Sequence, residues 1–413
     1  MTSLFRQESE KLKFLGILSA FLVPLLVTGP FLPDLLLSSL VIWFIVYSIK
    51  NKIFYEFRNI YFYFFIAFWL TCVLSSLLST NIQFSLKSSF FYVRIGIFAI
   101  FISFLINKHK EILDYFYYSF VITFLVIVID GYFQYFTGFN LIGLAIKDFR
   151  ISSFFGDELV MGSYLSRLFP LLFALFVIRK KNHTLEIFGI SLLFILVDVL
   201  IFLSGERAAF VLLNLSTIFI ILFITKYKML RLGVFILSCL MIITLTINDN
   251  KLYGRYVLTP IQSMGFNDTD GKKYFFTPAH DSLIKTSWNM FLDKPILGHG
   301  PKMFRIHCKN PKYSEGVKPC NTHPHNFYAQ LLAETGLIGF SFLAGLFIYF
   351  IYLTLKHIIE RWFQKKPGLT DYQICLLAGL LITIWPLTTN GSLFTNYLML
   401  FYSLQMGFFK KNL

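Results

Sequence analysis

Long apolar stretches recur along this chain, and they constrain its fold more than any other feature. Apolar runs of about 18 residues or more are typical of bilayer-spanning helices, because a hydrocarbon core needs about 20 apolar residues per helix. The sequence is 56% hydrophobic and only 14% charged, which is far from the balance of a soluble domain. The pattern therefore predicts an all-α, polytopic integral membrane protein.

The apolar stretches predict about twelve spanning helices. We expect them at residues 12–31, 32–49, 60–79, 87–106, 111–136, 159–178, 185–203, 208–225, 229–247, 330–355, 372–388 and 391–409. They divide the chain into helices one to nine (1–247), a long loop (248–325) and helices ten to twelve (326–413). A shorter loop at 137–158 joins helices five and six.

The basic residues follow the same alternation. The net charge is +15, and Lys and Arg gather in every second connection, beginning with the N-terminal segment. These connections contain Lys11, Lys13, Lys50, Lys52, Arg58, Lys108, Lys110, Arg179, Lys180, Lys181, Lys226, Lys228, Arg231, the 356–366 segment, Lys410 and Lys411. Because basic loops stay in the cytoplasm, both termini are predicted to be cytoplasmic and the long loop to lie outside. The charge then reflects topology, and no nucleic-acid partner is expected.

An amphipathic pattern lies within the long loop. Leu283, Ile284, Ser287, Trp288 and Phe291 recur at helical spacing. The pattern predicts a helix that lies on the membrane surface or caps the bundle.

Two cysteines, Cys308 and Cys320, fall in the long loop. An outer loop meets an oxidising environment, in which two nearby cysteines normally pair. A disulfide here would close a short loop, which is worth about 3 kcal/mol. Their spacing matches no usual zinc pattern. We therefore predict a Cys308–Cys320 disulfide that stiffens the chain just before His323.

The stretch SGERAAF, residues 204–210, begins the eighth predicted span at its outer face. Ser204 is the expected helix cap, and Arg207 then lies in the first turn. A cation there opposes both the helix dipole and the preference of basic residues for the cytoplasm. An anionic ligand such as a phosphate or diphosphate would resolve both conflicts. The alternative is pairing with Glu206 or reaching toward lipid headgroups.

Other arginines are candidates for pairing or binding. Arg150 lies on the shorter outer loop and is open to a ligand, although a plain surface role is equally compatible with its position. Arg94 and Arg167 lie within predicted spans, where ionisable groups face the bundle interior and need partners. The expected acidic partners are Asp130, Glu158 and Asp198.

The stretch NDTDG contains Asp268 and Asp270 in a D-x-D spacing. Such pairs hold a divalent ion on a nucleotide diphosphate, but nucleotide sugars are not expected outside the cytoplasm. Asn, Asp and Gly in a row are also ordinary turn residues, and we prefer that interpretation.

Two histidines stand out in CNTHPHNFYAQLLAETGLIG, residues 320–339. His323 and His325 precede a helix that should begin near Asn326, run through Glu334 and bend at Gly336. No third ligand of convincing spacing is visible, so a metal site is not predicted. A histidine at the water–membrane edge suits proton acceptance near neutral pH. A histidine that caps the helix or packs in a core is the alternative.

Three stretches together resemble the O-antigen ligase and O-antigen polymerase superfamily of bacterial envelopes. They are HPHNFYAQLLAETGLIGF, MFLDKPILGHGPKMFR and SGERAAF, and the order of spans and long loop is also similar. The resemblance implies an inverting glycosyl transfer that needs no metal or other cofactor, at the periplasmic face of the bacterial inner membrane. The donor would be a glycan on undecaprenyl diphosphate, and the acceptor lipid A–core for a ligase or another lipid-linked repeat for a polymerase.

The resemblance also assigns roles to residues. His325 matches the family's essential histidine, and Arg207 matches an arginine that grips the diphosphate. Where the family often has an arginine ahead of the MFLDKP element, this chain has His280. Either His280 makes the phosphate contact, or Arg305 or Arg150 supplies the charge. The supporting residues are expected to be His323, Asn326 and Glu334.

We prefer a ligase over a polymerase, although the sequence separates them poorly. A rival from another class is a transporter that moves a lipid-linked glycan across the membrane. Such a protein would line a path at the membrane midplane with charges and would need no imidazole in an outer loop.

Overall fold

The computed structural model describes residues 2–179, 183–265, 273–274 and 276–409. The residues singled out above that lie outside the described part are Lys180, Lys181, Asp268, Asp270, Lys410 and Lys411. The described part is helical, with isolated bridges but no strand. Its α-helices are α1 (Thr2–Ala20), α2 (Leu22–Leu25), α3 (Phe31–Lys50), α4 (Ile60–Leu77), α5 (Ile82–Ser89), α6 (Val93–Lys108), α7 (Ile112–Thr137), α8 (Met161–Ile178), α9 (Thr184–Leu203), α10 (Arg207–Phe223), α11 (Lys228–Asn248), α12 (Asn250–Tyr253), α13 (Thr259–Ser263), α14 (Pro278–Asp293), α15 (Phe304–His307), α16 (Phe327–Ile358), α17 (Asp371–Thr383) and α18 (Asn396–Phe409).

The predicted all-α, polytopic membrane fold is confirmed. Among the described residues, nine helices are long and apolar enough to cross a membrane, and α10 and α17 are apolar but shorter. Every predicted span overlaps one of the helices. The total of about twelve spans and the outward orientation of the long loop stay predictions.

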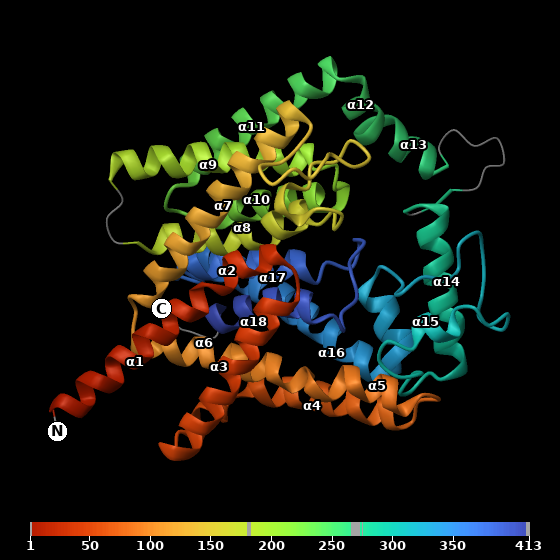
Figure 1. Cartoon of the computed structure of the whole chain (residues 1–413), viewed down its shortest axis with the longest axis horizontal. Helices are drawn as coiled ribbons and strands as arrows, with labels where there is room; N and C mark the ends of the chain where they lie inside the picture. The colour runs from red at the N-terminus through yellow and green to blue at the C-terminus, as the bar shows by residue number, and fades with distance from the viewer. Residues whose placement is uncertain (1, 180–182, 266–272, 275, 410–413) are drawn as a thin grey trace.

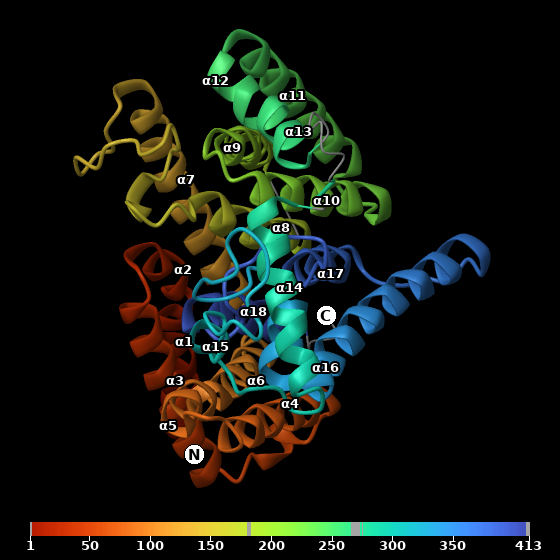
Figure 2. The same ribbon diagram turned by 90° about the vertical axis from the view of Figure 1, so that its right-hand side faces the viewer.

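Helix α8 lies at the centre of the bundle, where α7, α9, α10 and α17 pack around it. Nearly all of its side chains are buried. Figure 1 shows α7 and α9 to α11 on one side of the molecule and α3 to α6 on the other, with α8, α17 and α18 between them. Helices α14 and α15 lie across one end of the bundle, and Figure 2 views the molecule from that end. The polar segments of the long loop therefore cap an apolar core.

Helix α16 breaks at Gly336, as predicted from its glycines. Gly336 has φ 62° and ψ −162°, which is a conformation for glycine. The loop after α14 fills the break, because Leu337 N–H donates to the Pro295 carbonyl (2.8 Å) and Gly300 N–H donates to the Glu334 carbonyl (2.8 Å). A Cβ on Gly336 would lie 2.4 Å from the backbone of this loop. The GHGP stretch, residues 298–301, therefore packs against the kink and stabilises it. Beyond it, the second half of α16 projects away from the bundle (Figure 2).

The eleventh predicted span, 372–388, is too long by several residues. Helix α17 ends at Thr383, and residues 384–395 form a loop that leads into α18. Pro386 ends the helical hydrogen bonding because proline has no N–H to donate. The carbonyls of Pro386 and Thr388 accept hydrogen bonds from the Asn326 amide (2.8 and 3.3 Å). This loop, which we call the α17–α18 loop, therefore belongs to the capped end of the bundle.

Helix α14 occupies the position of the predicted amphipathic helix but turns a different face inward. Leu283 and Ser287 are buried as the pattern implied, together with Thr286 and Met290, whereas Trp288 is 50% exposed. The buried face packs on α16. Hydroxyl groups on this face are satisfied by the loop that follows, since Glu315 N–H donates to Thr286 Oγ1 (3.3 Å). The helix therefore buries a mixed face against protein.

The intramembrane arginines have partners other than the acids expected from the sequence. Arg94 pairs with Asp34 at 2.7 Å. Arg167 donates to the side-chain oxygen of Asn390 at 2.8 Å. Asp198 is taken by Arg231. The predicted partners were wrong because helix packing, which the sequence does not encode locally, decides which charges meet.

Candidate functional site

The turn between α9 and α10 shows why the stretch SGER has its composition. Gly205 has φ 69°, and a Cβ there would lie 2.9 Å from Cγ of Arg150, so only glycine fits. The Glu206 carboxylate accepts hydrogen bonds from the N–H groups of Gly162 (2.6 Å) and Ser163 (3.0 Å). Glu206 therefore satisfies the first turn of α8 and is committed to that role.

Arg207 is the first residue of α10, as predicted, but Ser204 is not its cap. Ser204 ends α9, and Glu206 is the residue that precedes α10. Arg207 is half-buried, and among the described residues its side chain makes no ion pair or hydrogen bond. The alternative in which Glu206 neutralises it is therefore wrong. An unpaired guanidinium at a helix N-terminus is a site that favours an anion.

Two further arginines reach the same turn. Arg150 donates from Nε to the Ser204 carbonyl at 3.3 Å. Arg255 donates from Nε and Nη2 to the Gly205 carbonyl at 3.0 and 2.7 Å. It lies in a π-helical turn, Gly254–Leu258, a rare geometry that is frequent at functional sites. These neutral acceptors orient the two guanidinium groups, and the Glu206 carboxylate offsets part of the positive charge of Arg150. We call Arg150, Arg207 and Arg255 the arginine cluster.

His280 faces the arginine cluster from the first turn of α14. Its Nδ1 lies 2.7 Å from Oγ1 of Thr277, which caps the helix. Burial lowers the pKa of His280, and the positive charge of Arg207 lowers it further. The ring centroid of His280 lies 5.6 Å from that of His325. His280 thus stands between the arginine cluster and His325.

His325 is held in an unusual backbone conformation. Its φ is 60°, which is uncommon for any residue other than glycine. The His325 carbonyl accepts a hydrogen bond from the N–H of Asn390 in the α17–α18 loop at 2.7 Å. Arg167, on the central helix α8, in turn binds the side chain of Asn390. A buried cation of the bundle thereby supports the loop that fixes His325.

The imidazole of His325 remains accessible for chemistry. Asn326, and not His325, caps α16, because its Oδ1 accepts from Tyr328 N–H (3.0 Å) and Ala329 N–H (3.1 Å). Nε2 of His325 lies 3.1 Å from the Asn321 amide nitrogen. Burial lowers the pKa of His325, and the nearby His280 adds to this effect. The ring is therefore neutral near pH 7 and able to accept a proton.

His323 lies against His325 on the other side, with ring centroids 4.2 Å apart. Burial first, then His325 and Arg305, lower the pKa of His323 to about 4. Its Nδ1 lies 2.9 Å from Oγ1 of Thr322. His323 is thus neutral, and it separates His325 from Arg305.

Glu334 ties the long loop to the first half of α16. Its Oε1 accepts from Phe304 N–H at 3.0 Å, and its Oε2 accepts from the Gln330 amide at 2.9 Å. The side-chain oxygen of Gln330, Oε1, in turn accepts a hydrogen bond from Leu393 N–H at 2.9 Å. The residue expected to support the site therefore joins three segments: α15, α16 and the α17–α18 loop.

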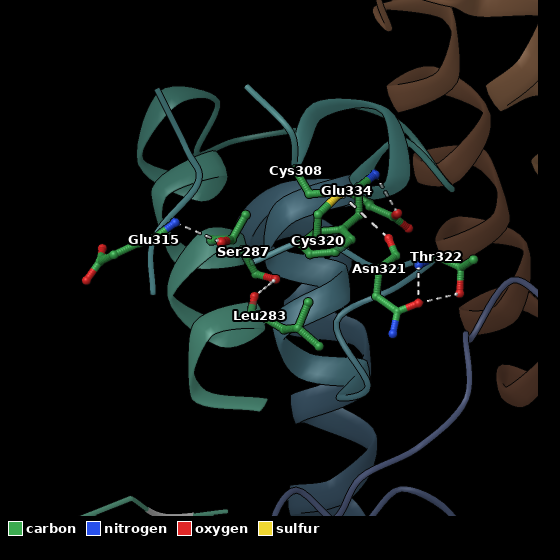
Figure 3. Close-up of a disulfide and its surroundings, with 10 residues drawn as sticks. Leu283, Ser287, Cys308, Glu315, Cys320, Asn321, Thr322 and Glu334 are labelled. Atoms are coloured by element: carbon green, nitrogen blue, oxygen red, sulfur yellow. Dashed lines mark hydrogen bonds between the residues drawn. A yellow bond between two sulfur atoms is a disulfide. The ribbon is translucent and has the colours of Figure 1, made fainter. Parts of the chain in front are cut away.

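The structure joins Cys308 and Cys320 in the predicted disulfide. Figure 3 shows it between α14 and the segment that leads to the histidines, with Asn321 and Thr322 immediately beside it. Both cysteines pack with a small apolar cluster that includes Leu283 of α14. The disulfide therefore fastens the segment before His323 to the rest of the long loop.

The structure brings together every residue that the sequence proposed for the site, and it adds others. Arg255, Lys302 and Asn390 were missed, and Arg167 was named but was expected to pair with an acid and not with Asn390. Arg255 carried a usable signal, because it is a cation on the predicted outer side, as Arg207 is. Asn390 had no local signal, since it fell in the short connection between the predicted spans 372–388 and 391–409.

A mostly apolar cavity of about 200 Å³ lies within the bundle. It is formed between α4, α6, α16, α17 and α18, and aromatic side chains such as Phe65 and Phe342 line it. Leu331 and Leu393 also line it, and both lie close in sequence to residues that hold His325. The described residues contain no group of three or more His, Cys, Asp or Glu that could hold a metal.

Comparison with known proteins bears on the same segments. Residues 190–344 match the family model described as O-antigen ligase. No curated protein matches the chain. The matched segment contains Arg207, Arg255, His280, Arg305 and His325 and leaves out Arg150. Residues 190–344 are therefore similar to the O-antigen ligase family, which agrees with the resemblance that the sequence motifs carry.

Proposed function

We propose that this protein is an O-antigen ligase of the bacterial inner membrane. It would transfer a glycan from undecaprenyl diphosphate to a sugar hydroxyl of lipid A–core at the periplasmic face. The observation that carries the proposal is the neutral imidazole of His325, which is held at φ 60° and whose ring contacts that of His280. The positive charge of Arg207 in turn acts on His280. This arrangement offers a proton acceptor beside an unpaired cation, and the reaction needs both.

The chemistry assigns each group a task. The acceptor oxygen attacks the anomeric carbon, its proton passes to the imidazole of His325, and the bond from that carbon to the diphosphate breaks. The departing electron pair stays on the diphosphate oxygen. Arg207, with Arg150, Arg255 and His280 around it, would stabilise that negative charge. A fixed set of cations does this at no reorganisation cost, so the proposed transfer requires no metal.

The apolar cavity supports a lipid-linked substrate. It lies between membrane helices, and nearly all of its lining is apolar, including Phe65, Phe342 and Leu346. A polyprenyl or acyl chain would meet mainly apolar atoms there and would displace few hydrogen bonds. A lipid entering from the membrane could then present its headgroup at the capped end of the bundle.

The decisive variant is His325→Ala, assayed with purified protein and a lipid-linked donor. We expect transfer to fall at least about a hundredfold, because general base catalysis contributes about 10²- to 10⁴-fold. His307→Ala is the matched control, since its ring contacts His299 and Tyr313. It should retain transfer within about twofold. Normal transfer by a folded His325→Ala protein would end the proposal.

Lipopolysaccharide from a deletion strain separates the ligase from the polymerase. Loss of all polymer on lipid A–core supports a ligase, whereas a single remaining repeat supports a polymerase. A transporter predicts no transfer from purified donor by the wild-type protein. Absence of transfer in that assay would favour the transporter class over both enzymes.

A further inference from the structure

Two cations beside His323 are not used by the donor site proposed above, although the family resemblance allowed Arg305 to contact the diphosphate. Lys302 and Arg305 precede and open α15, and both are half-buried. Their positive charges act on each other, and the charge of Arg305 also reaches His323. We call this pair the Lys302–Arg305 pair. It is distinct from the arginine cluster, which acts on His280.

The pair is not satisfied within the protein. Among the described residues, neither side chain makes an ion pair or donates a hydrogen bond, and Nε of Arg305 is buried without a partner. The nearby negative charge is Glu334. Its two oxygens already accept from Phe304 N–H and the Gln330 amide. Two half-buried cations therefore face one carboxylate that is bound elsewhere.

Leaving half-buried cations without partners costs free energy, and an anionic ligand would recover it. A guanidinium beside an ammonium group fits a phosphate, since arginine can bind two of its oxygens and lysine adds a point charge. Lys302 is also fixed at φ 62°, in the left-handed region that non-glycine residues seldom adopt. The backbone strain is one more sign that the position of Lys302 is specified by more than packing.

We propose that the Lys302–Arg305 pair binds a phosphate group of the acceptor glycolipid. The inference rests on the proposed function, and it deepens that function by naming the acceptor class. Ring contacts place His325 between His280, which faces the arginine cluster, and His323, which faces Arg305. A base flanked by two separate cationic sites can hold donor and acceptor at once. The acceptor hydroxyl then lies next to His325 and opposite the leaving diphosphate, as inversion requires.

The test uses the full-length protein in detergent or vesicles with a lipid-linked donor. The acceptor is supplied as phosphorylated lipid A–core and as the same glycolipid after phosphatase treatment. For the wild type, we expect dephosphorylation to raise the acceptor KM about tenfold, in line with the loss of charge-assisted hydrogen bonds. The donor KM should stay within about twofold.

The variants are Arg305→Gln and Lys302→Gln, with Arg305→Lys as the conservative change. Each Gln variant should raise the KM of the phosphorylated acceptor, leave that of the dephosphorylated acceptor unchanged and leave the donor KM unchanged. Arg305→Lys should restore part of the affinity. Lys309→Gln removes an exposed cation from the same region and should change neither KM.

Several results would overturn the proposal. Equal acceptor KM values with and without phosphate for the wild type would do so even if no variant folds. A rise in donor KM alone for Arg305→Gln would place the pair in the donor site instead. A rise in acceptor KM seen only with a second lipid-linked repeat as acceptor would also overturn the proposal for lipid A–core. The bound phosphate would then belong to the diphosphate of that repeat.

Failure of the proposed function would look different. In that case the wild-type protein transfers glycan to no acceptor, and binding is measured without donor. Weaker binding of phosphorylated lipid A–core to Arg305→Gln than to wild type would still support the pair as a phosphate site. Equal binding would reject it.

Discussion

The arginine inside the bundle and the arginines of the candidate site meet the same physical problem in opposite ways. Arg231 is fully buried, with bonds to both oxygens of Asp198 at 2.9 and 3.2 Å and to Thr217 at 2.8 Å. Arg207 and Arg305 are half-buried, and neither has such a partner among the described residues. A cation whose partner lies within the chain holds helices together. A cation without one is available to a ligand.

Replacing either partner of the internal pair should have the largest effect on stability. Arg231→Ala leaves the Asp198 carboxylate buried and unpaired, so we expect a loss of about 3–5 kcal/mol in unfolding titrations. The double change Asp198→Leu with Arg231→Met should cost much less, because no charge is left unpaired. Arg207→Ala should change stability by only about 0.5 kcal/mol but abolish donor binding. Undiminished donor affinity in Arg207→Ala would break the contrast.

Removing the disulfide should have the next largest effect, this time in the long loop. We expect the double variant Cys308→Ala with Cys320→Ala to lose about 2–4 kcal/mol, because the unfolded loop is no longer constrained. Reduction of the wild type should reproduce that loss. Cys375→Ala, which changes a cysteine without a disulfide, is the control. Free thiols at Cys308 and Cys320 under non-reducing mass spectrometry would contradict the pairing.

Arg167 sharpens the comparison because it is buried like Arg231 but supports the site. Arg167→Gln should cost about 1–3 kcal/mol through its lost hydrogen bond to Asn390. It should also lower kcat with little change in KM, since Asn390 N–H holds the His325 carbonyl. Asn390→Ala should show a related loss, and the two changes together should be less than additive. Additive effects would mean that Arg167 does not act through Asn390.

The smallest expected effect is a shift in pH dependence. His325 must be neutral to accept a proton, and its pKa is lowered, so transfer should fail only as pH drops below about 6.5. His280→Ala removes a cause of that lowering and should move the acid limb to higher pH. For stability, His323 has a folded pKa of about 4 and an ordinary value of 6.5. The contribution of neutral His323 to the free energy of unfolding is fully present above pH 6.5 and is lost as the pH falls toward 4. An unmoved acid limb in His280→Ala would show that His280 does not act on the base.

The sequence by itself determined the membrane class, nearly all the helix positions and the disulfide. Each depends on a local signal: runs of apolar residues, glycine at the α16 kink, and two cysteines in one long loop. The proposal that Arg207 binds an anion also depended on a local signal, because a cation at the start of a helix is unfavourable with the helix dipole in any fold.

Only the tertiary structure decided which groups meet. The sequence allows Glu206 to pair with Arg207, but in the structure its carboxylate accepts hydrogen bonds from the first turn of α8 instead. Asn390 reached His325 because α17 stops early and its loop folds back over α16. Nothing in the sequence paired Lys302 with Arg305, and only packing placed both beside a carboxylate already bound by Phe304 and Gln330. Hydrogen bonds and charge pairs act over a few ångströms between residues far apart in sequence, so helix packing alone determines which ones form.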